Sequence, residues 1–286
     1  MNPKEFQSLI KKAEGQLKDA GIDSAAAEVE IILCHLLSVE RIDLYVHGYD
    51  LINDRVIGKF HDIIARRMTR YPLQYILGET HFYGRRFLVD PDVMIPTPET
   101  ELLCDLAINH IKNQEYDSAT ILDIGTGAGV IAVTLACERP ECWITATDIS
   151  QAALAMARKN AALHEAMNNI TFLKSNLFSA ISQSDKFDFI LSNPPYIAEK
   201  EYPGLSPEVK AEPKISLLSG VEGMDMIMRI IDEAPQFLNE NGRILFEIGY
   251  NQGEKVADLT EKNPHFRSLS IIKDLNDIDR VVILST

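Results

Sequence analysis

From residue 119 to the end, the sequence alternates between short apolar runs rich in β-formers and longer segments with helical periodicity. Strands that alternate with helices need crossover connections, and these favour a parallel sheet with helices on both faces. We therefore predict an α/β fold for this part of the chain. The expected strands are Thr120–Asp123, Trp143–Thr147, Ile170–Leu173, Phe187–Leu191, Arg243–Ile248, Leu269–Lys273 and Arg280–Leu284, with helices at Ser150–Leu163 and Met224–Leu238 among the connections.

The link between the last two expected strands contains only Asp274–Asp279. A parallel connection needs a crossover of a dozen or more residues, so this link is too short for one. The last two strands should therefore pair in the antiparallel direction. The pattern as a whole predicts a mostly parallel seven-stranded sheet that ends in a C-terminal antiparallel hairpin.

The first part of the chain, residues 1–78, has helical periodicity throughout and predicts a small all-α domain of four or five helices. One helix should end before Gly21, and Asp23 or Ser24 can cap the next. Asp54–Arg70 should form another helix, followed by a short turn of helix after Pro72. Residues 79–98 predict a β-hairpin around Gly84 and a proline-rich linker, and residues 99–286 form the α/β domain, which opens with a helix at Glu99–Ile111.

The charge balance limits the possible partners. The formal net charge is −14, and an acidic surface repels phosphate backbones, so direct nucleic-acid binding is not expected. The basic run Arg66–Arg70 is interpreted as a solvated helix end in preference to a basic patch. We expect no signal peptide and no membrane-spanning segment, which predicts a cytoplasmic protein. The four cysteines have no metal-ligand spacing and are expected to be free thiols, so no metal site is predicted.

A glycine-rich turn follows the first expected strand. Gly125, Thr126, Gly127, Ala128 and Gly129 lie between that strand and a helix, and Asp123 comes just before them. Glycines let the backbone approach a ligand closely, while a helix N-terminus presents free N–H donors. The spacing G-x-G-x-G differs from the pyrophosphate-binding G-x-G-x-x-G. It favours a ligand whose zwitterionic amino-acid end needs an amine acceptor, such as Asp123, together with amide donors.

Two further positions fit the same ligand. Asp148 ends the next strand, where a carboxylate can accept hydrogen bonds from both hydroxyls of a ribose. Ser150 can cap the following helix by itself, so Asp148 is available for the ligand. After the third strand, Asn176 could reach the edge of an adenine and Leu177 could pack on its face. A polar turn before a short helix is an equally good interpretation of that segment.

The fourth strand leads into Asn193-Pro194-Pro195-Tyr196. In open α/β sheets, ligands bind beyond the carboxyl ends of the strands. Two consecutive prolines fix two φ angles, so the Pro194 carbonyl points in a set direction. The Asn193 side-chain oxygen and the Pro194 carbonyl can accept both hydrogens of a planar NH₂ group, and Tyr196 can pack on the substrate. These residues therefore predict a catalytic pocket for an amide or an exocyclic amine.

The sequence resembles the peptide chain release factor N5-glutamine methyltransferases over essentially its full length. The resemblance rests on Pro72–Gly78, Phe82–Gly84, Ile95–Glu101, Phe246–Gly249 with Gln252, and Asp279-Arg280, besides the glycine turn and Asn193–Tyr196. The sequence departs from the family pattern at three places. Thr97 stands where Arg is usual, Asn176 stands where Asp is common, and Asn276-Asp277 stand where a small residue and Gly are more usual.

The resemblance implies a Rossmann-like methyltransferase that uses S-adenosylmethionine. Its expected reaction is methylation of the side-chain amide nitrogen of the glutamine in the Gly-Gly-Gln motif of peptide chain release factors 1 and 2. Asn193–Tyr196 would bind that glutamine, and Asn193 would also touch the cofactor. The cofactor would otherwise lie against Gly125–Gly129 and Asp148, and the helical N-terminal domain would recognise the release factor. The alternatives are N5-glutamine methylation of a ribosomal protein and N6-adenine methylation of nucleic acid.

Overall fold

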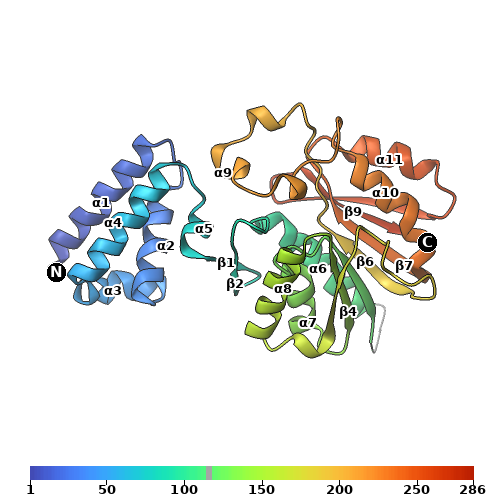
Figure 1. The fold of residues 1–286 in the computed structure, drawn as a ribbon, viewed down its shortest axis with the longest axis horizontal. Helices are drawn as coiled ribbons and strands as arrows, with labels where there is room; N and C mark the ends of the chain where they lie inside the picture. Colours follow the sequence, from blue (N-terminus) through green and yellow to red (C-terminus); the bar gives the residue numbers. More distant parts are fainter. Residues whose placement is uncertain (114–117) are drawn as a thin grey trace. The chain divides into compact units, whose positions relative to one another are not determined.

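The computed structural model describes residues 1–113 and 118–286, which form two compact units (Figure 1). The N-terminal unit contains residues 1–79 together with residues 206–211. The C-terminal unit contains residues 80–205 and 212–286. A short segment far along the sequence therefore packs with the N-terminal helices.

The N-terminal unit consists of helices around one hydrophobic core, as predicted. Its centre contains fully buried side chains such as Leu17, Val29 and Phe60. One helix, Arg41–Leu51, was not predicted individually, because most of its apolar side chains face outward. The helices are α1 (Pro3–Asp19), α2 (Ala25–Leu37), α3 (Arg41–Leu51), α4 (Asp54–Met68), α5 (Leu73–Leu77) and α9 (Pro207–Lys210).

Local capping explains where two of these helices begin. In α1, the Glu5 amide donates to the Asn2 side chain and the Asn2 amide donates to the Glu5 carboxylate, each at 3.0 Å. This is a capping box, which satisfies two N–H groups that the helix leaves free. Ser24 occupies the N-cap position of α2, as expected, but its hydroxyl donates to Glu28 instead of accepting from the helix.

The end of α4 differs from the expected solvated helix end. Arg67 is 5% exposed and donates hydrogen bonds to Glu28 and Glu208. Its neighbour Arg66 is exposed. The interpretation of Arg66–Arg70 as a wholly solvated run is therefore wrong for Arg67, whose charge is balanced inside the unit. A buried arginine needs such partners because an unpaired charge is very costly to bury.

The C-terminal unit is built on a seven-stranded sheet with the order β5-β4-β3-β6-β7-β9-β8. All neighbouring pairs are parallel except those of β9, which runs antiparallel to both β7 and β8. This confirms the predicted sheet and its C-terminal hairpin. The strands are β3 (Thr120–Ile124), β4 (Trp143–Asp148), β5 (Ile170–Lys174), β6 (Phe187–Ser192), β7 (Leu238–Glu247), β8 (Ser268–Lys273) and β9 (Asp279–Ser285).

Helices cover both faces of this sheet (Figure 1). On one face, Leu122 of β3 and Ile190 of β6 share a core with Ile227 of α10 and Val256 of α11. The other face is covered by α6, α7 and α8. The longer helices are α6 (Pro98–Asn113), α7 (Val130–Glu138), α8 (Gln151–Leu163), α10 (Asp225–Glu233) and α11 (Gly253–Glu261), with 3₁₀ turns at η1 (Met167–Asn169), η2 (Tyr202–Gly204), η3 (Lys214–Ser216) and η4 (Ala234–Phe237).

Two boundaries differ from those expected by more than two residues. The helix predicted to continue to Leu238 ends as an α-helix at Glu233, and a 3₁₀ turn that contains Pro235 follows. Proline lacks the N–H that the helix would need there. Strand β7 begins at Leu238, before the predicted Arg243, because Leu238 already pairs with Phe187.

The predicted hairpin is formed by β1 (Glu79–Phe82) and β2 (Arg85–Leu88). Its turn residues, Tyr83 and Gly84, both have positive φ angles. In the described part of the chain, every helix is too short or too polar to span a lipid bilayer.

Candidate active site

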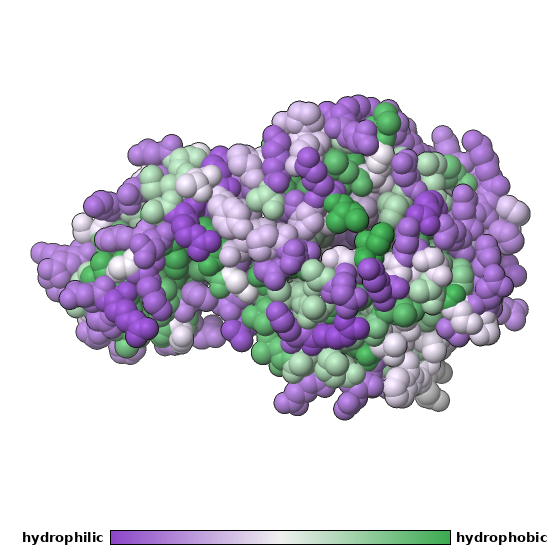
Figure 2. Space-filling view, in the orientation of Figure 1, coloured by the Kyte–Doolittle hydropathy of each residue, from purple (hydrophilic) through white to green (hydrophobic). Residues whose placement is uncertain are grey.

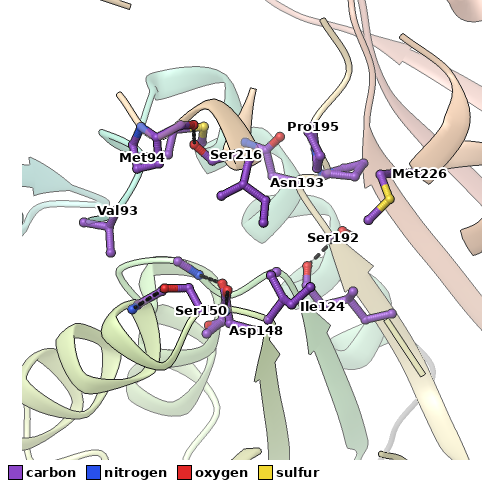
Figure 3. A pocket seen from close by; sticks show the side chains of 18 of the residues that line it. Val93, Met94, Ile124, Asp148, Ser150, Ser192, Asn193, Pro195, Ser216 and Met226 are labelled. Atoms are coloured by element: carbon purple, nitrogen blue, oxygen red, sulfur yellow. Dashed lines mark hydrogen bonds between the residues drawn. The ribbon is translucent and has the colours of Figure 1, made fainter. Parts of the chain in front are cut away.

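The site is organised by two neighbouring parallel strands, β3 and β6. Ile124 at the end of β3 pairs with Ser192 at the end of β6. The Ser192 hydroxyl also donates to the Ile124 carbonyl at 2.9 Å (Figure 3). The next residues along the two strands, Gly125 and Asn193, therefore leave the sheet side by side. The strand register brings together the two motifs that the sequence analysis singled out.

The glycine turn is held by the end of β4. The amides of Gly125 and Thr126 donate to the Thr147 carbonyl at 2.8 and 2.9 Å. Gly125 and Gly127 have φ angles of +72° and +55°, a region that residues with a Cβ rarely adopt. An added Cβ at Gly125 would meet no protein atom within 4 Å. The turn therefore presents bare backbone to open space, as a close-fitting ligand requires.

Asp148, the last residue of β4, holds the glycine turn through its carboxylate. Its carboxylate accepts hydrogen bonds from the Gly127 amide at 2.9 Å and the Ser150 amide at 2.8 Å. Burial raises the pKa of Asp148, against the effect of these backbone donors. Ser150 caps α8 by accepting from Ala153, as expected, and the binding of a ligand by Asp148 stays a prediction.

Asp123 lies behind the turn. It is fully buried and accepts a hydrogen bond of 2.6 Å from the Thr126 hydroxyl. Burial raises its pKa to about 7, despite that hydrogen bond. Asp123 is not among the residues that line the cavity described below. In this structure it fixes Thr126 within the turn.

A cavity of about 320 Å³ opens at the carboxyl ends of these strands, within the usual size range of small-molecule sites. Figure 2 shows hydrophobic side chains beside a hollow on this unit, and Figure 3 shows Asp148 and Asn193 on different sides of the cavity. Its lining includes most of the predicted site residues. These are Gly125, Thr126, Gly127, Ala128, Asp148, Asn176, Leu177, Asn193, Pro194 and Pro195.

Gly129 and Tyr196 were also predicted site residues, and they stand outside the lining. Gly129 is the N-cap of α7, and an added Cβ there would lie 2.9 Å from the Ala157 Cβ. It therefore allows the turn to approach α8 closely. Tyr196 faces inward, and its hydroxyl donates to the Glu247 carboxylate at 3.2 Å.

Asn193 carries the most informative polar atom of the site. Its amide nitrogen donates to the Thr100 hydroxyl at 2.9 Å. Its side-chain oxygen Oδ1 is buried and has no hydrogen-bond partner among the described residues. The structure also shows no donor from the described part of the chain to the Pro194 carbonyl. Because buried polar atoms are nearly always paired, an unpaired oxygen beside a cavity is a candidate acceptor for an N–H or O–H group of a ligand.

The interior behind Asn193 contains a buried carboxylate. Glu247 is 1% exposed and accepts from Thr100 at 2.8 Å as well as from Tyr196. Burial raises its pKa to about 7, although Thr100, Arg280 and Tyr196 act in the opposite direction. Gln252 donates to the Tyr196 carbonyl at 2.9 Å and so fixes the end of the motif.

The segment after β5 borders another part of the cavity. Leu177 is 5% exposed, with a φ angle of +51°. The Asn176 side-chain oxygen accepts from Arg229 at 3.2 Å. Both residues line the cavity, and their contacts with the adenine of a cofactor stay a prediction.

Several lining residues were not predicted. Val93, Met94, Pro96 and Thr100 come from the linker and the start of α6, and Ile215 and Ser216 come from the loop after β6. Thr100 and Glu247 fall within stretches that resemble the family, but nothing local assigned them a role. No group of three or more potential metal ligands is found among residues 1–113 and 118–286.

Comparisons with known proteins agree with this geometry. Residues 8–78 match the family described as the PrmC N-terminal domain, and residues 100–206 match the methyltransferase small domain. A release factor glutamine methyltransferase of Nitratidesulfovibrio vulgaris is 38% identical over 97% of this chain and 94% of its own length. One from Cereibacter sphaeroides is 40% identical over 96% and 95%.

A crystal structure of a methyltransferase from Pyrococcus furiosus also resembles the chain. It covers 71% of this chain and 90% of its own, with 20% identity and a TM-score of 0.51. At that level of identity, the likeness is one of fold.

Proposed function

The chain belongs to the family of release factor glutamine methyltransferases, and we propose that its substrates are peptide chain release factors 1 and 2. In the proposed reaction, the side-chain amide nitrogen of the glutamine in their Gly-Gly-Gln motif receives a methyl group from S-adenosylmethionine. The observation that carries the proposal is the buried, unpartnered Asn193 Oδ1 beside the cavity.

The cavity residues fit the cofactor. The bare backbone at Gly125 and Gly127 leaves room for a close-fitting ligand, and Asp148 offers a carboxylate at the strand end. We assign the ribose hydroxyls to Asp148 and the adenine to the neighbourhood of Asn176 and Leu177. When bound, S-adenosylmethionine supplies an electrophilic methyl group on a positively charged sulfur.

Asn193 and Pro194 would hold the acceptor. Their two carbonyl oxygens can accept both N–H groups of a glutamine side chain, which turns the nitrogen lone pair toward the methyl group. In the transfer, a nitrogen–carbon bond forms, the sulfur–carbon bond breaks, and the nitrogen gives up one proton to solvent. An amide nitrogen is a poor nucleophile, so rate enhancement must come chiefly from positioning, which can supply about 7–11 kcal/mol.

The same NH₂ geometry exists in adenine, so the pocket alone does not choose the substrate. The formal charge of −14 disfavours binding to nucleic acid, and the family favours a release factor over a ribosomal protein. We assign recognition of the release factor to the N-terminal unit. The proposed substrates act in translation, which places the reaction in the cytoplasm.

The direct test is a methylation assay with radiolabelled S-adenosylmethionine. Separate reactions would contain a release factor, a ribosomal protein and adenine-containing RNA or DNA, and mass spectrometry would locate each methyl group. We expect label on the Gly-Gly-Gln glutamine of the release factor. A release factor with that glutamine replaced by alanine is the matched control and should remain unlabelled. Label on nucleic acid or on the ribosomal protein alone would overturn the proposal.

A further inference from the structure

We infer that Thr100 and Glu247 are positioning residues that hold the Asn193 side chain with its oxygen toward the substrate amide. This inference rests on the proposed function, because it concerns how that substrate is oriented. Neither residue needs to touch the substrate or the cofactor for this role. They act through a chain of hydrogen bonds that starts in the interior and ends at Asn193.

The side chains of Glu247, Thr100 and Asn193 form a continuous chain of hydrogen bonds, which we call the relay. Glu247 Oε2 lies 2.8 Å from Thr100 Oγ1, and Thr100 Oγ1 lies 2.9 Å from Asn193 Nδ2. Thr100 and Glu247 are each 1% exposed. Water therefore has little access to compete for these bonds, and each partner depends on the next.

The number of available protons fixes the direction of the relay. A threonine hydroxyl has a single proton. A carboxylate can only accept, so when Glu247 is ionised, Thr100 must donate its proton to Glu247. The Thr100 oxygen is then able only to accept, and Asn193 must present its NH₂ group to it. The opposite end of the amide, Oδ1, is thereby turned away from Thr100 and left for the substrate.

This direction matters because an asparagine amide is nearly symmetrical in shape. A reversed Asn193 would fit the same space but would present its own NH₂ to the substrate NH₂. Two hydrogen-bond donors that face each other cannot form a hydrogen bond. The substrate nitrogen that receives the methyl group would then lose its orientation. The relay thus makes the site selective for a hydrogen-bond donor.

Tyr196 is tied to the same carboxylate. Its hydroxyl donates to Oε1 of Glu247 at 3.2 Å, while Thr100 uses Oε2. The first and last residues of the motif Asn193–Tyr196 are therefore both held by the Glu247 carboxylate, Asn193 through Thr100 and Tyr196 directly. The positive charge of Arg280 favours the ionised form of Glu247, and the negative charge of Glu99 opposes it.

The test compares Thr100→Val, which keeps the shape but removes the hydroxyl, with Thr100→Ser, which keeps the hydroxyl. Thr134→Val is the matched control, because Thr134 is also fully buried but its hydroxyl has no partner among the described residues. For a release factor substrate, we expect Thr100→Val to lower kcat about 100-fold, as misplacement of a reacting group does. The KM and the affinity for S-adenosylmethionine should change little.

Thr100→Ser should recover most of the wild-type kcat, and Thr134→Val should match wild type. A merely structural role would make serine more damaging than valine, because valine keeps the methyl group that fills the space and serine lacks it. A loss in Thr100→Ser that equals or exceeds the loss in Thr100→Val, or a wild-type kcat in Thr100→Val, would overturn the inference.

A second readout does not depend on methyl transfer. In the cofactor-free protein labelled with ¹⁵N-asparagine, the Asn193 side-chain NH₂ should exchange slowly with water in wild type and in Thr100→Ser. It should exchange rapidly in Thr100→Val, whereas similar exchange in all three would refute the relay. If wild type transferred no methyl group to the release factor, the proposed function would fail, and this spectrum would decide the relay separately.

Discussion

Arg67 donates a hydrogen bond of 2.9 Å to Glu208, although the two residues are 141 positions apart in the sequence. Arg70 donates to both oxygens of the same carboxylate, at 2.5 and 2.9 Å. Burial alone would raise the pKa of Glu208, but the donors from Arg70 and Arg67 outweigh it and lower that pKa to about 2. Charge pairing therefore holds residues 206–211, which follow the Asn193–Tyr196 motif, to the N-terminal unit.

Replacing Arg67 by methionine should destabilise the N-terminal unit. The change leaves the Glu28 carboxylate without its buried arginine and leaves Glu208 paired with Arg70 alone. Loss of one member of a buried ion pair costs about 3–5 kcal/mol. Urea unfolding followed by circular dichroism would measure the loss. Arg66→Met is the matched control, because Arg66 is exposed, and it should change the free energy of unfolding by less than about 0.5 kcal/mol.

The pairing of Arg67 with Glu208 also predicts how the free energy of unfolding changes at low pH. A carboxyl whose pKa is lowered by folding contributes stability above its unfolded pKa, and that contribution disappears as the pH falls toward the folded value. The stability difference between wild type and Arg67→Met should therefore shrink between about pH 4.3, the usual pKa of glutamate, and the folded value near 2. An undiminished difference at the acidic end would contradict this account of Glu208.

Replacing Asn193 by alanine should abolish most methyl transfer and spare cofactor binding. The change removes the Oδ1 acceptor, and loss of one such polar group commonly lowers kcat about 10²–10³-fold. Calorimetric titration with S-adenosylmethionine should show a dissociation constant close to that of wild type, because the glycine turn and Asp148 remain. Asn276→Ala, in the exposed turn between β8 and β9, is the control and should keep full activity. Near-normal transfer by Asn193→Ala would refute the assignment of this pocket.

The rate should depend on the ionisation of Glu247, whose pKa is raised to about 7 by burial. Below that value the carboxyl is protonated and can donate to Thr100, which no longer forces Asn193 into one orientation. At saturating substrates, kcat should therefore rise between about pH 6 and about pH 8. Arg280, Glu99 and Tyr196 face the same carboxyl and tune its pKa.

Two other carboxyls, the fully buried Asp123 and the half-buried Glu212, also have pKa values that burial raises to about 7. The Thr100→Val variant separates their effects from that of Glu247, because it breaks the relay and leaves all three carboxyls in place. Its low residual kcat should vary much less with pH. A Thr100→Val profile with the same shape as that of wild type would assign the titration to a different group.

Two glycine-to-alanine substitutions should have opposite effects on stability. At Gly129, where φ is +84°, an added Cβ would lie 3.0 Å from the backbone of Ala157, so alanine should cost about 1–3 kcal/mol. Gly58 lies on an exposed position of α4 with no atom within 4 Å of the added Cβ, so alanine should stabilise by about 0.5–1 kcal/mol. Thermal unfolding would measure both, and destabilisation by Gly58→Ala would contradict the described course of α4.

The sheet could be predicted because its signals are local. Each strand is a short apolar run, and the brief link at Asp274–Asp279 sets the direction of the last pair. The glycine turn and Asn193–Tyr196 were recognisable for the same reason, since each is a contiguous motif. The helix α3 was missed because Ile42, Tyr45 and Val46 are 72%, 60% and 52% exposed. Their positions did not produce a recognisable buried face.

The supporting residues could not be predicted in this way. Thr100 and Glu247 are 147 positions apart, and their hydrogen bond exists only in the folded chain. A threonine at the start of a helix and a glutamate at the end of a strand are ordinary in their local settings. Glu208 is similar, because nothing near it in the sequence indicates pairing with Arg67 and Arg70.

The pairing of Ile124 with Ser192 has a practical consequence for redesign. The residues proposed to bind the methyl donor follow β3, and those proposed to bind the methyl acceptor follow β6. Backbone pairing between these two strands sets the spacing between the two groups of residues. A change of acceptor can therefore be attempted after Ser192 while the turn at Gly125–Gly129 is left intact. Because the two strand ends keep a constant separation, a new methyl acceptor can be positioned relative to an unchanged cofactor site.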